Sequence, residues 1–522
     1  MVVDYGVAAV GRGKLPPMSD ALLILRLSGD FYTKARKTRM RFLRRLGANA
    51  EAALHAHGIP YKLEKTWSRL YVETPDPAGA SEALSRVFGF QSVSEVTPRP
   101  WESLEDVVSE GVRFFADSVR GRSFAVRATR RGDRGRIGFD SIQVERALGR
   151  ALLDAGAARV NLDEPEVTAF VEIEPGTAHF FEEKVPAHGG LPVGVEGRGV
   201  ALVSGGFDSA VASWLLLKRG VQLDYVFCNL GGSAHRIGVL RVMKEINDRW
   251  SYGYKPTLHE VDFAPLALLL REKARPEHWQ IILKRFMLRA GAAVAHRGGR
   301  LGLVTGDAMG QVSSQTLQNI AVINQVAPAI PVLRPLVGFN KEEILALARK
   351  IGIHDLSAAV GEYCDLMPRR PATRAVLQQV LRDEAAMDAE ELLHGLIDTR
   401  TIFDLRRLPP EALGSPVLET DRVPEGATLL DLRSATAFRA WHYPGSLHLD
   451  FGRALAAWPS FDKGRPYVLV CEVGLKSAHL AERMQAEGFE ALHFRGGIKE
   501  LMALAEREKV AVAALLAPAV RD

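Results

Sequence analysis

The sequence predicts a multidomain protein that combines α+β and α/β domains. The chain has 522 residues, which is enough for about three or four domains. Up to about residue 190, strands and helices follow one another in the irregular order that is typical of α+β domains. From Gly199 onward, apolar strands alternate regularly with helices, which is typical of a doubly wound parallel sheet.

The same patterns divide the chain into six predicted segments. These are a flexible extension rich in Gly and Pro (1–20), an α+β domain (21–97), a second α+β domain (98–190), a doubly wound domain (191–374), a helical and Pro-bearing linker (375–422) and a C-terminal α/β domain (423–522). Pro409, Pro410 and Pro416 mark the linker, because proline interrupts regular structure.

Apolar patterns predict the elements of the first two domains. The first domain has strands at 22–27, Leu70–Val72 and Ser92–Thr97, and helices in the basic run that ends near His57 and at Ala80–Phe88. The second has helices at Ser103–Arg120 and Ser141–Ala155 and strands at Phe124–Ala128, Val167–Ile173 and His179–Glu183.

The remaining elements follow from the same reasoning. The doubly wound domain has strands at Val200–Val203, Leu223–Phe227, Leu258–Val261 and Leu301–Thr305, and helices at Ala210–Arg219, Trp279–His296 and Asn340–Lys350. The C-terminal domain has strands at Leu429–Asp431, Tyr467–Cys471 and Ala491–Phe494 and a helix at Ser477–Glu487.

Two basic runs in the N-terminal third indicate a polyanionic partner. Residues 31–45 carry seven Lys and Arg without an acid, and residues 119–136 carry seven Arg and one acid, Asp133. A single charge run is commonly a solvated face, but two such runs favour nucleic acid. The candidate RNA-binding residues are Lys34, Arg36, Lys37, Arg39, Arg41, Arg127, Arg130 and Arg131.

Cysteine usage and the N-terminus indicate a cytoplasmic protein. The three cysteines form no CxxC pair, which argues against a disulfide scaffold and a zinc site. The N-terminus lacks the pattern of a signal peptide. The longest apolar stretch, Val510–Val520, is too short to span a bilayer. We therefore expect neither a membrane partner nor a tightly bound metal or organic cofactor.

The clearest motif is Ser204-Gly205-Gly206-Phe207-Asp208-Ser209, between an apolar strand and a helix. Two adjacent glycines allow a turn with positive φ and a close approach to a ligand. The first amides of the helix then face an anion, and both serines add hydroxyl donors. The simpler alternative is a structural corner in which Asp208 caps the helix. The complete string favours a nucleotide site.

This loop resembles that of the PP-loop ATP pyrophosphatases, which split ATP between the α and β phosphates. The longer strings ILKRFMLRA, GQVSSQTL, RPLVGFNKEEI and EYCDL are similar to those of one family, the tRNA 4-thiouridine synthetases (tRNA sulfurtransferases). The resemblance extends from about Ala21 and includes a THUMP-like stretch around Ser123–Leu148. It implies N-terminal ferredoxin-like and THUMP domains, a PP-loop domain and a C-terminal rhodanese-like domain.

The resemblance also implies ATP, accompanied by Mg, as the nucleotide. It adds ATP contacts outside the loop, at Leu202, Val203, Lys284, Gly306 and Gln315. It further implies that Lys341, in the first turn of its helix, contacts the activated uridine or its phosphates. Asp208 and Lys341 therefore join the predicted catalytic residues. Without the resemblance, Lys284 and Gln315 read as ordinary polar surface residues.

Cys471 is the predicted sulfur carrier. It lies at a strand end before a short loop and a helix, where backbone amides and the helix field stabilise a thiolate or persulfide. This stretch resembles a rhodanese. Glu472 and Lys476 stand where many rhodanese loops carry arginine, a departure that bears on free thiosulfate more than on a carrier role. The alternative is a buried structural cysteine.

The resemblance implies a role for Cys364 as well. By itself Cys364 reads as an inert thiol, but the family pattern implies that it resolves the persulfide on Cys471 by forming a disulfide. The implied reaction adenylates O4 of the uridine at tRNA position 8 and replaces this oxygen with sulfur. The implied partners are tRNA, a cysteine desulfurase, a disulfide reductant and, for the thiazole of thiamine, a sulfur carrier protein.

Two alternative functions stay open at this point. One is a PP-loop enzyme that amidates a base or joins two substrates, which would not need Cys471. The other is a tRNA-binding module without catalysis, which would not turn over ATP. Cys228 directly follows a strand and is expected in the core.

Overall fold

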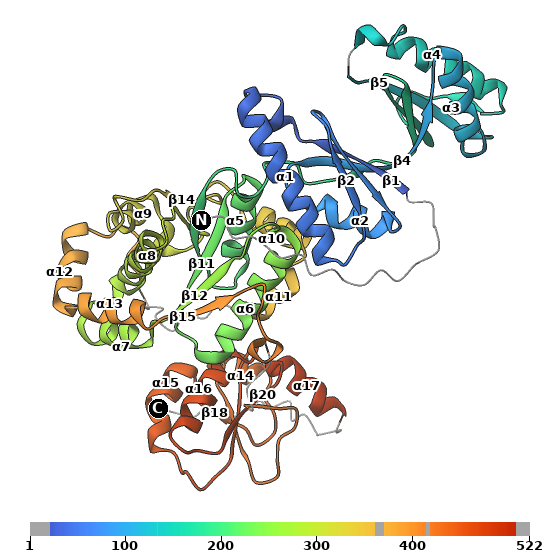
Figure 1. The fold of residues 1–522 in the computed structure, drawn as a ribbon. Helices are drawn as coiled ribbons and strands as arrows, with labels where there is room; N and C mark the ends of the chain where they lie inside the picture. Colours follow the sequence, from blue (N-terminus) through green and yellow to red (C-terminus); the bar gives the residue numbers. More distant parts are fainter. Residues whose placement is uncertain (1–20, 133, 361–369, 414–417, 508–522) are drawn as a thin grey trace, which may run out of the picture. The chain divides into compact units, whose positions relative to one another are not determined.

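The structure, a computed structural model, describes residues 21–132, 134–360, 370–413 and 418–507 (Figure 1). The chain divides into two compact units, Met1–Leu191 and Pro192–Asp522. Among the described residues, no helix combines the length and the apolar character that crossing a membrane requires.

The described part of the first unit is built on one nine-stranded sheet. The strand order is β2-β3-β1-β4-β8-β7-β5-β6, and β9 pairs with β4. The strands are β1 (Ala21–Leu27), β2 (Lys62–Lys65), β3 (Arg69–Thr74), β4 (Phe90–Pro100), β5 (Ser123–Arg130), β6 (Arg159–Val160), β7 (Val167–Glu174), β8 (Thr177–Phe181) and β9 (Val185–Pro186). All the strands predicted in this unit are confirmed, whereas the short β2, β6 and β9 were not predicted.

Strand β4 belongs to both of the predicted N-terminal domains. Up to Val96 it pairs antiparallel with β1, and from Thr97 it pairs antiparallel with β8. The predicted boundary between residues 97 and 98 therefore falls inside a continuous strand. Helices α1 (Arg36–Ala56) and α2 (Pro77–Ser85) accompany the β1–β4 half, and α3 (Leu104–Val119) and α4 (Ser141–Asp154) pack on the β5–β8 half.

A buried glutamate links the two halves of this sheet. Oε1 of Glu172, in β7, lies 2.5 Å from Nε of Arg26, and Oε2 lies 3.3 Å from Nε of Arg69. Burial by itself would raise the pKa of Glu172, but the charges and hydrogen bonds of the two guanidinium groups outweigh burial and lower it. The ion pairs thus join β7 to β1 and β3.

The second unit contains the predicted doubly wound sheet. Its described strands have the order β14-β13-β10-β11-β12-β15. They are β10 (Arg198–Leu202), β11 (Gln222–Asn229), β12 (Thr257–Asp262), β13 (Leu303–Val304), β14 (Val332–Leu333) and β15 (Thr401–Asp404). The pairs are parallel except that β15 is antiparallel to β12. Because the chain builds outward from β10 in both directions, the order reverses between β10 and β13, where such sheets bind ligands.

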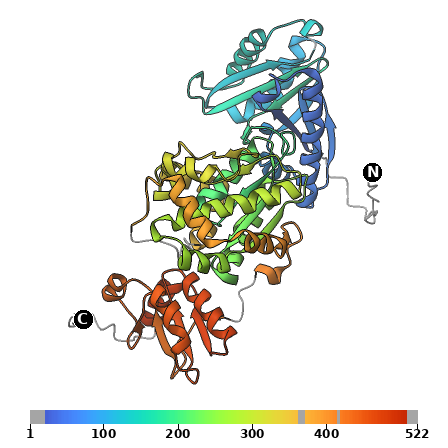
Figure 2. The ribbon, with the colours of Figure 1, turned by 90° about the vertical axis from the view of Figure 1, so that its left-hand side faces the viewer.

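Helices cover the two faces of this sheet (Figure 2). One layer contains α5 (Phe207–Lys218), α6 (Gly232–Trp250), α10 (Lys341–Ile351) and α11 (His354–Val360). The other contains α7 (Ala264–Lys273), α8 (Trp279–Arg297), α9 (Leu317–Asn324), α12 (Leu377–Met387) and α13 (Glu390–Asp398).

The first part of the predicted linker 375–422 belongs to this domain instead. Val380 and Met387 of α12 and Leu393 and Ile397 of α13 are buried in the core that α8 also lines. The strand β15 then adds an edge to the sheet. The charged composition that suggested a linker reflects the outer surface of two amphipathic helices.

A five-stranded parallel sheet forms the described part of the C-terminal domain. Its order is β16-β20-β19-β17-β18. The strands are β16 (Glu419–Thr420), β17 (Thr428–Asp431), β18 (Leu447–His448), β19 (Tyr467–Val470) and β20 (Ala491–Phe494), and the helices are α14 (Ala435–Ala440), α15 (Phe451–Ala457), α16 (Leu475–Ala486) and α17 (Gly497–Arg507). Helix α16 packs on β19 and β20 and also against α6 of the preceding domain.

Candidate active site

The loop from Ser204 to Ser209 joins β10 to α5 at the carboxyl edge of the sheet. Its backbone is held by Ser209 Oγ, which accepts a hydrogen bond from Ser204 N–H (3.2 Å) and donates one to Gly206 O (3.2 Å). His235 Nε2 lies 3.1 Å from Ser204 O. Burial lowers the pKa of His235 to about 4, so that its ring is neutral and Nε2–H donates to this carbonyl.

The two glycines of the loop have different conformations. Gly205 has a φ of +78°, and a Cβ there would lie 3.0 Å from Val360 and 3.1 Å from Val239. Gly206 has a φ of −74° and is the N-cap of α5. The expected positive φ in this turn is therefore found at Gly205 and not at Gly206. The cap position also excludes Asp208 as the residue that caps this helix.

A cavity of about 250 Å³ lies beside the loop, at the carboxyl ends of β10, β11 and β13. Eight of the predicted ATP contacts line it, namely Leu202, Val203, Ser204, Asp208, Ser209, Lys284, Gly306 and Gln315. Gly205, Gly206 and Phe207 shape the loop without lining the cavity. The fold thus gathers residues from four separate segments of the sequence at one position.

Asp307 organises the polar side of this cavity. Its Oδ1 is 2.8 Å from Lys284 Nζ, and its Oδ2 accepts hydrogen bonds from Thr305 Oγ1 (2.8 Å) and Arg334 Nε (3.2 Å). Burial alone would raise the pKa of Asp307, but these cations and hydrogen bonds outweigh burial and lower it to about 2. Asp307 is therefore an anion that holds Lys284 toward the cavity.

Gly306 allows two parts of the site to touch. A Cβ at this position would lie 2.6 Å from Ser209 N and 2.7 Å from the Asp208 carbonyl carbon. Only a residue without a side chain permits this approach of the segment after β13 to the phosphate loop.

Lys341 forms an ion pair with Asp208 of the loop. Its Nζ is 3.0 Å from Asp208 Oδ1, while Gln311 Nε2 donates to Asp208 Oδ2 at 2.9 Å. Lys341 begins α10, which Asn340 and Glu343 cap as predicted. The same Nζ is 5.7 Å from the ring centre of Phe207, so Lys341 is adjacent to the loop without lining the cavity.

The sequence reasoning missed four residues of this site: Asp307, Gln311, Arg334 and His235. Gln311 stands within GQVSSQTL, and Asp307 follows the predicted strand Leu301–Thr305 and the predicted ATP contact Gly306, but neither had been assigned a role. Arg334 follows β14 and His235 lies in α6. Arg334 opens the string RPLVGFNKEEI, which the resemblance includes, but it had not been assigned a role, whereas His235 carries no local signal.

The second predicted site surrounds Cys471, directly after β19. Its Sγ accepts a hydrogen bond from Gly474 N–H (3.2 Å) and lies 3.4 Å from Ser477 Oγ. Gly474 has a φ of +94° and is the N-cap of α16. The predicted arrangement of a cysteine before a helix N-terminus is present, and the side chain is buried at 1% exposure.

The structure describes only one of the other two cysteines. Cys228 is buried in the core of the doubly wound domain, as predicted, and burial raises the pKa of its thiol. Cys364 lies outside the described residues.

The first predicted RNA-binding run forms the start of α1. Arg36, Lys37 and Arg41 are exposed and Lys34 is half-buried. Arg39 departs from the prediction, since its side chain is covered by Tyr32 and Trp67, at 5.0 and 4.4 Å from their ring centres. Its Nη2 donates to Trp67 O at 3.0 Å. Arg39 is therefore a packing residue with little room for a phosphate contact.

The second run spans β5, in which Arg127 and Arg130 lie, and Arg131 directly follows the strand. Arg127 is exposed and Arg130 and Arg131 are half-buried. Arg127 donates to Leu162 O, and Arg130 Nη1 donates to Phe139 O at 2.8 Å. Arg127 and Arg130 thus tie β5 to the segments at Leu162 and Phe139, while part of each side chain stays open to solvent.

Four family models match the chain in the order that the fold shows. They are the ThiI ferredoxin-like domain at residues 22–94, the THUMP domain at 102–181, the thiamine biosynthesis protein (ThiI) at 194–389 and the rhodanese-like domain at 418–504. The fold class predicted from the sequence is thereby confirmed.

Relatives extend along nearly the whole chain. The tRNA sulfurtransferase of Pyrobaculum aerophilum is 36% identical over 478 residues, which cover 91% of this chain and 96% of the relative. That of Shewanella woodyi is 31% identical over 482 residues, which cover 90% and 98%. A 4-thiouridine synthetase crystallised with RNA and bound ATP superposes with a TM-score of 0.63 at 27% identity, covering 74% of this chain and 99% of that one. With this identity over almost all of both chains, the protein belongs to the tRNA sulfurtransferase family.

Proposed function

We propose that this chain is an ATP-dependent tRNA sulfurtransferase that converts a tRNA uridine to 4-thiouridine. The observation that carries this proposal is the joining of the SGGFDS loop with Lys284 and Asp307 in one cavity, in a chain that also holds Cys471 at a helix N-terminus. The related synthetase binds RNA and ATP.

ATP is expected to place its phosphates at the loop, where Ser204, Ser209 and the first amides of α5 are donors. O4 of the uridine, by resemblance at position 8, attacks the α-phosphorus, and pyrophosphate leaves. Lys284 and Lys341, each held by an aspartate, supply positive charge where negative charge develops. If Mg accompanies ATP, Asp208 and Asp307 are the cavity carboxylates that would hold it.

Sulfur delivery then replaces the adenylated oxygen. A persulfide on Cys471 attacks C4 with its terminal sulfur, and AMP departs with the oxygen. The thiolate of Cys364 next attacks Cys471 Sγ, which breaks the bond to the transferred sulfur and forms a Cys364–Cys471 disulfide. A reductant supplies two electrons and two protons to restore both thiols, and a cysteine desulfurase reloads Cys471. A thiamine-pathway carrier protein would accept sulfur from the same persulfide.

The position of the Cys471 loop supports this exchange. Val473 and Gly474 line a cavity of about 410 Å³ together with Val360, the last described residue before Cys364. Four residues of extended chain span at most about 14 Å. Cys364 follows Val360 by four residues in the sequence, which is why we expect it to meet Cys471 on this face of the domain.

The proposal can be tested in cells that lack this protein. Their bulk tRNA should lack 4-thiouridine by mass spectrometry, and the wild-type chain should restore it. Cys471→Ser should not restore it, although this variant should still exchange ATP with pyrophosphate. A normal level of 4-thiouridine in the deleted cells would exclude the proposed function and favour a PP-loop enzyme with another product.

A further inference from the structure

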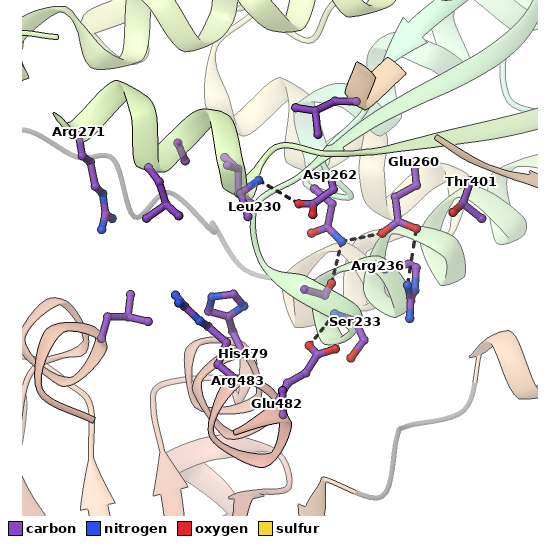
Figure 3. A pocket seen from close by; sticks show the side chains of 18 of the residues that line it. Leu230, Ser233, Arg236, Glu260, Asp262, Arg271, Thr401, His479, Glu482 and Arg483 are labelled. Atoms are coloured by element: carbon purple, nitrogen blue, oxygen red, sulfur yellow. Dashed lines mark hydrogen bonds and ion pairs between the residues drawn. The ribbon is translucent and has the colours of Figure 1, made fainter. Parts of the chain in front are cut away.

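A second cavity in the described part of the second unit has not been given a role. It has a volume of about 710 Å³ and lies between α6, α7 and α16 (Figure 3). Leu230, at the carboxyl end of β11, lines both this cavity and the ATP cavity. The two cavities therefore adjoin each other at the ligand-binding edge of the sheet.

The N-terminus of α6 opens into this cavity. The helix has 19 residues, and its N-cap, Gly231, provides no side chain to satisfy the first amides. Instead, Ser233 N–H donates to Glu482 Oε2 of α16 at 2.9 Å (Figure 3). A Cβ on Gly232 would lie 2.5 Å from the same oxygen, so the glycine makes room for this carboxylate. A carboxylate of the rhodanese-like domain thus occupies the place where a helix binds an anion.

The unsatisfied hydroxyl of Ser233 indicates that this site binds a ligand other than Glu482. The residue is 7% exposed and lines the cavity, yet its Oγ has no hydrogen-bond partner among the described residues. A buried hydroxyl without a partner is unfavourable. Glu482 satisfies the Ser233 amide and leaves the hydroxyl unsatisfied. A phosphate carries more acceptor oxygens than a carboxylate and can bind both donors.

The charges around the cavity favour an anion. Arg236 of α6, Arg271 of α7 and Arg483 of α16 line it from three separate helices (Figure 3). The acidic side chains nearby already accept hydrogen bonds. Glu260 accepts from Asn229 Nδ2 at 2.6 Å and lies 3.7 Å from Arg236 Nη1, and Asp262 accepts from Ala264 N–H at 2.9 Å. Arg400 also lines the cavity, so four arginines face three carboxylates there.

We propose that this cavity is a phosphate site, in which a phosphate group displaces Glu482 from the N-terminus of α6. The source of the group is either the RNA backbone next to the target uridine or the pyrophosphate product, and both sources rest on the proposed function. Because Glu482 belongs to α16, its displacement loosens the contact that holds the Cys471-bearing domain on α6. Phosphate binding and domain docking therefore compete.

Binding to the full-length chain tests this proposal, with a non-hydrolysable ATP analogue filling the ATP cavity. Inorganic pyrophosphate and a tRNA transcript are titrated separately into the wild type and its variants. E482Q should tighten binding of whichever of the two probes occupies the site by about tenfold, because a neutral glutamine side chain competes less well for the backbone N–H of Ser233. S233A should weaken binding by about tenfold through loss of one hydrogen bond to a charged group.

The matched control is E487Q, which removes an exposed charge at the end of the same helix and should change neither affinity. If S233A lowers the unfolding temperature of the protein, R236Q is used in its place and should also weaken binding. If the variants change the affinity for pyrophosphate in the absence of RNA, the site binds the product. If they change only the affinity for tRNA, the site binds the RNA backbone. Equal affinities of wild type, E482Q and S233A for both probes would overturn the proposal. Thiolation is not measured, so failure of the proposed sulfur chemistry would not produce this result.

Discussion

The Nζ atom of Lys341 lies 3.0 Å from Oδ1 of Asp208 and joins the first turn of α10 to the first turn of α5. A lysine in the first turn of a helix is unfavourable for the helix dipole. The aspartate offsets this cost and fixes the ammonium group beside the phosphate loop. The pair is therefore arranged to meet a phosphate that arrives between the two helices.

K341M and D208N should each lower the rate of ATP–pyrophosphate exchange by about 100-fold, because each removes or releases a charge positioned for the transition state. Binding of tRNA should change little in either variant. K350M, at the opposite end of α10, is the control and should exchange normally. Wild-type exchange in both test variants would remove this ion pair from the adenylation step.

Gly306→Ala should weaken ATP binding and slow adenylation together. The added Cβ would meet backbone atoms of Asp208 and Ser209 at less than 3 Å, so the phosphate loop must move. A displacement of about 1 Å in such a site costs on the order of 100-fold in rate. Gly338→Ala is the matched control, since a Cβ there has no neighbour within 4 Å among the described residues. Equal ATP affinity of the two variants would contradict the close approach.

Local pattern was sufficient to predict most strands, the phosphate loop and the setting of Cys471. Asp307 could not be assigned in this way, because Lys284 and Arg334 lie 23 and 27 residues from it and meet it only through the order of β13, β10 and β14. The sequence shows that Asp307 follows a strand, but it does not show which residues pair with Asp307.

Arg39 shows the limit of reasoning from a charge run. Composition gives the number of arginines, but the face of a helix on which each one lies depends on what packs there. Trp67, 28 residues further along, covers Arg39 and removes it from the basic surface. For the same reason α12 and α13 resembled a linker, since their apolar faces are buried against a helix that begins about 100 residues earlier in the chain.

Acid should destabilise the first unit through Glu172. Its pKa is lowered in the folded state, so its contribution to stability is complete above the unfolded value of about 4.3 and is lost as pH falls through the folded value. E172Q should reduce the free energy of unfolding at neutral pH by about 3–5 kcal/mol, because it leaves two buried guanidinium groups without their anion.

Hydrogen exchange of β1 and β7 measured between pH 3 and 7 would report this change. In the wild type, protection of these strands should decline below about pH 4.3, and in E172Q the decline should be smaller. E73Q, which removes a surface partner of Lys62, is the control and should leave the profile unchanged. The same decline in E172Q and in the wild type would exclude Glu172 as its source.

Affinity for tRNA should fall steeply with salt if the basic surfaces contact phosphates. Replacing the exposed Arg36 and Lys37 by Gln should weaken binding and reduce the slope of log affinity against log salt by about two units, because each lost phosphate contact contributes about one. The covered Arg39 gives the contrast. R39Q should destabilise the domain while leaving the salt slope unchanged. A slope that falls as much in R39Q as in the double variant would contradict its assignment as a packing residue.

The paired cysteines give the most direct test of sulfur transfer. Cys471→Ser should abolish 4-thiouridine formation while ATP–pyrophosphate exchange continues, because the cysteine loop is distinct from the nucleotide cavity. Cys364→Ser should still accept a persulfide on Cys471 but should stop after about one turnover, since no thiol remains to release the transferred sulfur. Non-reducing peptide mapping of the wild type after one turnover without reductant should show a Cys364–Cys471 disulfide, whose Cα atoms must approach to about 4.4–6.8 Å. The buried Cys228→Ser variant controls for loss of a thiol in general. Because Cys228 also lines the ATP cavity, the comparison is made at saturating ATP, where its sulfur transfer per folded molecule should match the wild type. If Cys364→Ser sustains many turnovers at the wild-type rate, an external thiol resolves the persulfide and Cys364 has no part in the cycle.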